Sequence, residues 1–105
     1  ILPVFVFNSL AVMDNKSFFM NSFFSGHVQG VGFRYQVVSM AKGFDLTGFV
    51  KNLNDGRVEL LAEGDESEVL SFLEAIESEL DIYIKSVEKQ TGSRIRQCSN
   101  FSIRA

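Results

Sequence analysis

Cysteine, histidine, proline and tryptophan are nearly absent from this chain of 105 residues. The single cysteine, Cys98, excludes an internal disulfide and favours a reducing compartment, so we expect a cytoplasmic protein. One histidine and one cysteine do not make the ligand set of a metal site, so we expect no metal and no other cofactor. The apolar run of residues 1–12 is too short to cross a bilayer, and we expect no membrane partner.

An excess of basic residues is also missing. Lysine and arginine number 10 against 13 acidic residues, which gives a formal net charge of −3. Nucleic-acid-binding domains usually present a basic face, so we expect no nucleic-acid partner. A small anionic substrate is compatible with this charge, because one local positive site can hold a phosphate group.

Apolar residues are abundant: hydrophobic residues make up 46% of the chain, and 11 residues are phenylalanines. A chain of this length forms one domain with one core. We expect residues 17–105 to form that domain, preceded by an N-terminal extension over residues 1–16. No basic residue precedes the apolar run, which argues against a secretory signal. We expect a monomer, with a dimer that pairs two chains through the N-terminal segment as the alternative.

Hydrophobic periodicity from residue 17 onward predicts the order strand, helix, strand, strand, helix, strand. The two helices share an i, i+4, i+7 apolar pattern, and Asn54–Asp55–Gly56 has the composition of a hairpin turn. The predicted strands span 17–25, 47–53, 57–62 and 82–90, with a short closing strand at 101–103, and the predicted helices span 33–44 and 65–80. This order predicts an α+β fold, in which two helices cover one face of an antiparallel sheet.

Three local details follow from composition. Thr91–Gly92–Ser93 is predicted to be a turn that interrupts the fourth strand. The Asp65 carboxylate is expected to cap the second helix by accepting a hydrogen bond from the backbone N–H near Glu68. The acidic run of residues 63–68 is expected to face solvent.

The segment GHVQGVGFR, residues 26–34, places three glycines between a predicted strand and a predicted helix. Glycines allow successive backbone N–H groups to converge on an anion, and a helix N-terminus adds a partial positive charge. Arg34 follows with a planar guanidinium that binds phosphate through two hydrogen bonds. The segment predicts a phosphate cradle; taken alone, a tight turn with an exposed arginine is the alternative.

The same segment resembles the first signature of the acylphosphatase family, Gly-x-Val-Gln-Gly-Val-x-Phe-Arg, at every specified position. A second block, GFVKNLNDGRV, begins at residue 48 and continues to residue 64, and it resembles the second signature of that family. The resemblance covers residues 18–104 and departs from the family at Phe24, where a small aliphatic residue is usual. It implies a ferredoxin-like βαββαβ fold that hydrolyses a small-molecule acyl phosphate.

The resemblance also implies the site residues. It implies two catalytic residues: Arg34, which binds the phosphoryl group, and Asn52, which orients the attacking water. An amide suits that second role, because a carboxylate would repel the substrate. The phosphate-binding residues that it implies are His27, Val28, Gln29, Gly30, Val31, Gly32, Phe33 and Arg34.

Several alternatives stay open. A non-catalytic phosphate-binding or regulatory module on the same fold is the main one. His27 is a candidate general base, although no partner for it is evident, and Lys51 and Asp55 are interpreted as a surface charge and a turn residue. The phenylalanines of residues 18–24 resemble a base-stacking platform for RNA, but the chain lacks the basic-aromatic block of RNA-recognition domains.

Overall fold

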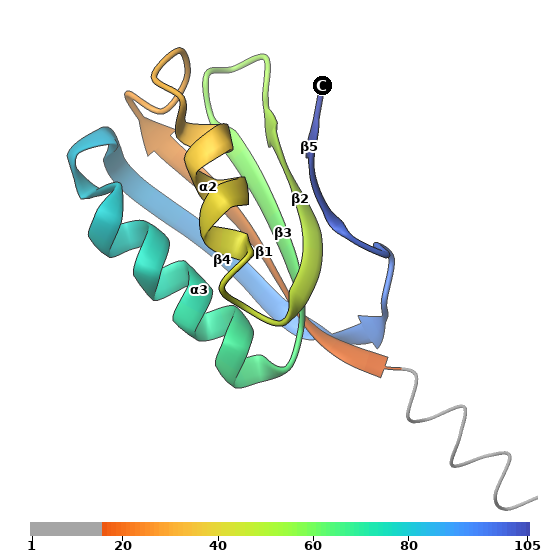
Figure 1. Ribbon diagram of the computed structural model, residues 1–105. Coiled ribbons are helices and arrows are strands. Elements are labelled where there is room, and N and C mark those ends of the chain that lie inside the picture. Colours follow the sequence, from red (N-terminus) through yellow and green to blue (C-terminus); the bar gives the residue numbers. More distant parts are fainter. Residues whose placement is uncertain (1–15) are drawn as a thin grey trace, which may run out of the picture.

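The computed structural model describes residues 16–105, which form one five-stranded sheet with two helices on one of its faces (Figure 1). The elements in chain order are β1 (Lys16–Gly26), α2 (Phe33–Ala41), β2 (Leu46–Asn52), β3 (Val58–Gly64), α3 (Glu66–Glu79), the 3₁₀ turn η1 (Asp81–Tyr83), β4 (Ile84–Ile95) and β5 (Phe101–Arg104). The predictions for the N-terminal segment concern residues 1–15, which lie outside the described residues, and Lys16, which is the first residue of β1. Within residues 16–105, no helix has the length and apolarity needed to span a membrane.

The strand order across the sheet is β4-β1-β3-β2-β5. Four strands pair antiparallel, as expected, but β5 pairs parallel with β2, so the sheet is mixed. The prediction of a wholly antiparallel sheet is therefore wrong at its last strand. The cause is topological: β4 and β5 occupy opposite edges, and residues 96–100 carry the chain from one edge to the other (Figure 1).

The predicted turn at Thr91–Gly92–Ser93 is wrong, because β4 runs through it. Thr91 pairs with Met20 and Gly92 with Phe19, in a ladder whose register is continuous from Lys16 to Ser25 of β1. Gly92 allows the Phe19 ring to lie close to the backbone of β4, because a Cβ at this position would lie 2.7 Å from a ring carbon of Phe19. Composition alone does not separate these two uses of glycine.

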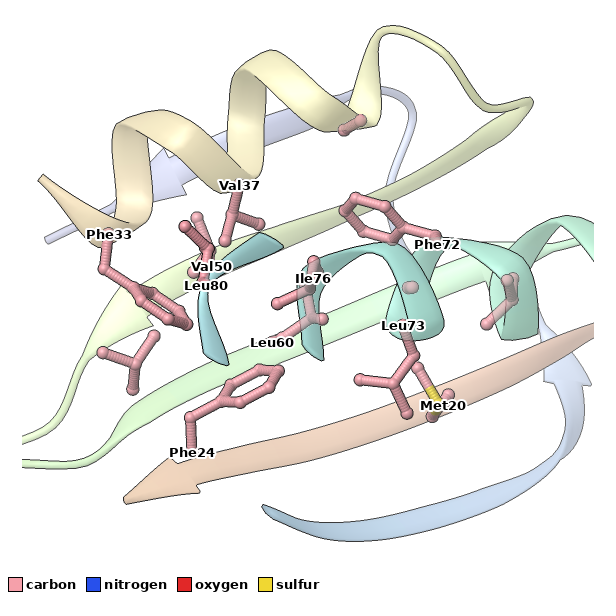
Figure 2. Packing of buried hydrophobic residues seen from close by; sticks show 14 of the residues in the cluster. Met20, Phe24, Phe33, Val37, Val50, Leu60, Phe72, Leu73, Ile76 and Leu80 are labelled. Carbon is pink, nitrogen blue, oxygen red and sulfur yellow. The ribbon is translucent and has the colours of Figure 1, made fainter. Parts of the chain in front are cut away.

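The core lies between the sheet and the two helices (Figure 2). Alternation along β1 sends Met20 and Phe24 to the helix face, where both are fully buried. The inward face of α3 contributes Val69, Phe72, Leu73 and Ile76. Phe33, the first residue of α2, packs against Phe24 with ring centroids 5.4 Å apart, which fixes the start of this helix over the end of β1.

The predicted helix cap is wrong, and the acidic run of residues 63–68 faces solvent only in part. Asp65 occupies the N-cap position of α3, but its carboxylate accepts a hydrogen bond from the Ser67 hydroxyl at 2.6 Å and none from the helix backbone. Glu63 is buried instead of solvent-facing, with 1% of its surface exposed. Its carboxylate accepts the backbone N–H groups of Gln97 and Cys98 at 2.8 and 2.9 Å, so it holds the segment that crosses between β4 and β5.

Candidate active site

The loop between β1 and α2 has the backbone that its glycines predict. Gly30 and Gly32 have φ angles of 78° and 80°, in the left-handed region, and Gly32 is the N-cap of α2. A Cβ at either position would meet no atom within 4 Å, so the requirement is conformational and not one of space. The first turn of α2 contains no acidic residue, which leaves the positive end of this helix free for an anion.

The fold brings this loop to the end of β2. A cavity of about 190 Å³ is lined by Val28, Gly30, Gly32, Phe33, Arg34, Tyr35 and Asn52. Asn52 is the last residue of β2 and pairs with Val58 of β3, and by alternation its side chain shares the helix face of the sheet with Val50. The two residues expected to carry the chemistry, Arg34 and Asn52, therefore line the same cavity from different elements.

Both polar side chains are free to bind a ligand. The Asn52 Oδ1 atom is buried and has no hydrogen-bond partner within residues 16–105. A buried acceptor without a partner costs about 1–3 kcal/mol, so its retention in a cavity points to a partner that the ligand or a water supplies. Across the part of the chain that the structure describes, the Arg34 side chain forms no hydrogen bond or ion pair, and its five N–H donors remain available.

The predicted phosphate-binding residues separate into two groups. Five of the eight line the cavity, and these are Val28, Gly30, Gly32, Phe33 and Arg34. The side chains of the other three lie outside the cavity lining, which leaves only their backbone N–H groups for a phosphate. His27 is exposed and does not line the cavity, Gln29 turns toward the β2–β3 hairpin, and Val31 packs against the core.

Two neighbours of the site have structural explanations. Lys51 pairs with Glu59 on the face of the sheet opposite to Asn52 and does not line the cavity. Asp55 forms an ion pair with Arg57 at 2.8 Å. Hydrogen bonds from the backbone N–H and then the side chain of Arg57 hold the pKa of Asp55 below its usual value. Asp55 thus closes the hairpin turn, as the sequence predicted.

Sequence reasoning missed one residue of the cavity. Tyr35 follows Arg34 in the first turn of α2 and is 72% exposed at the rim. Its position directly after the arginine was the only signal available. A larger cavity of about 390 Å³ lies elsewhere, between the end of α3 and β4, and is lined by Glu77, Asp81, Ile84, Lys85, Ser86, Val87 and Lys89. Its lining combines two acidic residues with two lysines and contains none of the residues that the sequence singles out, so the smaller cavity is the candidate site.

Comparison with known proteins gives a consistent result. The family model described as acylphosphatase matches residues 20–103. An acylphosphatase of Bacillus subtilis is 57% identical over 53 residues, which cover 50% of this chain and 58% of that protein. By sequence, the aligned part therefore spans less than two thirds of that curated relative.

Solved structures extend the similarity over the whole domain. The crystal structure of acylphosphatase from Bacillus subtilis superposes with a TM-score of 0.77 at 37% identity and covers 84% of this chain and 99% of that one. An acylphosphatase structure from Coxiella burnetii gives a TM-score of 0.74 at 31% identity, covering 88% of this chain and 96% of that one. The expected α+β arrangement, with two helices on one face of the sheet, is confirmed.

Proposed function

Since this chain belongs to the acylphosphatase family, we propose that it hydrolyses the carboxyl–phosphate bond of acyl phosphates to a carboxylate and inorganic phosphate. The observation that carries the proposal is the shared cavity. Arg34, the glycine loop and the unpartnered Asn52 Oδ1 line one space of about 190 Å³. That combination offers donors for a phosphoryl group on one side and an acceptor for water on the other.

The phosphoryl group would lie against the loop. Backbone N–H groups of residues 27–33, the N-terminus of α2 and the Arg34 guanidinium would hold its oxygens. Phosphoryl transfer needs mainly positioning and charge stabilisation on these oxygens. The leaving group is a carboxylate, which departs without a strong general acid. These residues therefore cover the electrostatic part of the reaction.

Asn52 would position the nucleophile. Its Oδ1 can accept one O–H of a water and turn an oxygen lone pair toward phosphorus, without adding a negative charge beside the phosphate. Orientation of this kind lowers a barrier by several kcal/mol, up to about 7–11. We assign the proton of this water to a phosphate oxygen of the substrate, because His27 does not line the cavity. A rate profile governed by an enzyme group that titrates near neutral pH would contradict this assignment.

Three further points remain proposals. Residues 17–105 form the acylphosphatase-like domain and residues 1–16 precede it; the family match over residues 20–103 supports this division. We place the protein in the cytoplasm, with the free thiol of Cys98 in support. We propose a monomer, with a dimer that pairs two chains through the N-terminal segment as the alternative; one chain suffices for activity, because it supplies all the lining of the cavity.

The direct test is hydrolysis of benzoyl phosphate by the full chain in the presence of a chelator. We expect turnover, with a single ¹⁸O from labelled water in the released phosphate and none in the benzoate. Label in the benzoate would show attack at the carbonyl carbon and would contradict the assigned role of Asn52. If the protein binds inorganic phosphate but does not turn over, the non-catalytic binding module replaces the proposed enzyme.

A further inference from the structure

The side chain of Gln29 has a role that its place in the phosphate loop does not explain. Its Nε2 donates one hydrogen bond to the carbonyl oxygen of Leu53 at 2.8 Å and another to that of Arg57 at 2.9 Å. Both partners are carbonyl oxygens, so both N–H groups of the side-chain amide are used. Gln29 is half-buried, which shields these bonds from water.

The two acceptors belong to the turn that joins β2 to β3. Leu53 directly follows Asn52, and its N–H donates to the Arg57 carbonyl at 2.8 Å, while the Gly56 N–H donates to the Leu53 carbonyl at 3.2 Å. Gln29 therefore joins the pair of hydrogen bonds that closes the turn. Within residues 16–105, no other hydrogen bond links loop 27–32 to residues 53–57.

We propose that Gln29 is a positioning residue for the hydrolysis, an inference that rests on the proposed function. Its amide fixes the distance between the loop that holds the phosphoryl group and the end of β2 that carries Asn52. In-line attack requires the water and the phosphorus to be aligned, and a misplacement of about 1 Å can reduce the rate about 100-fold. In the proposed function, the loop N–H groups and Arg34 bind the phosphate. The Gln29 side chain donates to Leu53 and Arg57 and hydrogen-bonds neither of these groups.

The proposal separates two quantities that a purely structural role would change together. Gln29→Met keeps the length of the side chain and removes both donors. We expect kcat for benzoyl phosphate to fall about 10- to 100-fold. The Kd for inorganic phosphate, measured by calorimetry, should stay within about threefold of the wild type, since the cradle is intact. Gln36→Met is the matched control, because Gln36 is an exposed residue of α2 outside the cavity lining; its kcat should equal that of the wild type.

Amide hydrogen exchange provides a readout independent of catalysis. In Gln29→Met, the Leu53 and Gly56 amides should exchange at least about tenfold faster, while amides of the α3 core stay unchanged. If Gln29→Met does not fold, Gln29→Asn shortens the side chain by one methylene group and supports the same comparison of kcat, Kd and exchange.

The outcomes separate this inference from the proposed function. An inactive wild type overturns the proposed function, and the positioning role with it, whatever the exchange rates. An active wild type with unchanged kcat or unchanged exchange in the Gln29 variant overturns the positioning role alone. A parallel loss of kcat and phosphate affinity also overturns it, because Gln29 would then build the cradle itself.

Discussion

The two faces of the sheet bury their phenylalanines in different ways. On the helix face, α2 and α3 cover Phe24, which is fully buried (Figure 2). On the opposite face, arginine side chains lie over the rings: the guanidinium carbon of Arg94 is 4.0 Å from the ring centroid of Phe19, and that of Arg57 is 4.8 Å from Phe23. One face is closed by secondary structure and the other by long amphipathic side chains.

This difference accounts for the place of the candidate site, which lies on the helix face. Packing by two helices fixes backbone positions, and the cavity with Arg34 and Asn52 lies on the helix face, at the end where α2 begins. An arginine over a phenylalanine contributes about 0.5–1 kcal/mol at an exposed site and covers the ring with its aliphatic stem and guanidinium group. The helix face therefore has the rigidity that a catalytic arrangement requires. The arginine-covered rings also offer no free platform on which bases could stack, unlike the surface that residues 18–24 resembled in sequence.

The strongest test of the contrast uses two adjacent phenylalanines of β1. Phe24→Ala should destabilise the protein by about 3–5 kcal/mol, because it empties part of a closed core. Phe23→Ala, the matched change on the other face, should cost only about 1–2 kcal/mol, since this side chain is already partly exposed. Chemical denaturation measures both values. Equal losses would show that the arginine-covered face is a second core.

A smaller effect is expected where the chain crosses between the edge strands. Glu63→Ala removes the acceptor of the Gln97 and Cys98 N–H groups and should lower the free energy of unfolding by about 2–3 kcal/mol. Glu59, on the same face of β3, accepts only a side-chain bond from Asn21 at 3.1 Å, and Glu59→Ala should cost less than about 1 kcal/mol. Urea titration of both variants checks this order. A Glu63 variant as stable as the wild type would contradict the assigned role of the carboxylate.

The smallest effect is expected for a single arginine on the arginine-covered face. Arg94→Ala exposes the Phe19 ring and should cost about 0.5–1 kcal/mol, measured by thermal denaturation. Arg96→Ala is the control, because Arg96 is exposed and lies over no aromatic ring of residues 16–105. An equal loss of stability in the two variants would show that the contact between Arg94 and Phe19 does not stabilise the protein.

How well the sequence predicted the fold follows the same division between the faces. On the helix face, periodicity identified β1 and α3, because their apolar positions recur with the period of a strand or a helix. The closing strand was predicted near residues 101–103, but its parallel pairing, the burial of Glu63 and the strand through Gly92 were not. Each depends on a partner distant in sequence: Glu63 on residues 97–98, Gly92 on Phe19, and β5 on β2. Local composition holds no record of such contacts.

The candidate site shows the same limit. The glycines and Arg34 were predictable, because a strand, a glycine-rich loop and a helix form an anion site by local geometry. Asn52 came only from the resemblance to a family, and the structure now gives it a physical setting, with its Oδ1 unpartnered in the cavity. The hydrogen bonds of the Gln29 side chain were not predictable, because their acceptors are backbone carbonyls with no residue-type signal.

The most direct test of the central claim compares Arg34→Ala with Asn52→Ala in turnover of benzoyl phosphate and in calorimetric binding of inorganic phosphate. Arg34→Ala should abolish measurable turnover and raise the phosphate Kd at least about tenfold, because the charged donors are lost. Asn52→Ala should lower kcat at least about 100-fold and leave the Kd within about threefold, because only the water loses its partner. An Asn52 variant that keeps its kcat, or that loses phosphate affinity as Arg34→Ala does, would contradict the division of roles between the loop and β2.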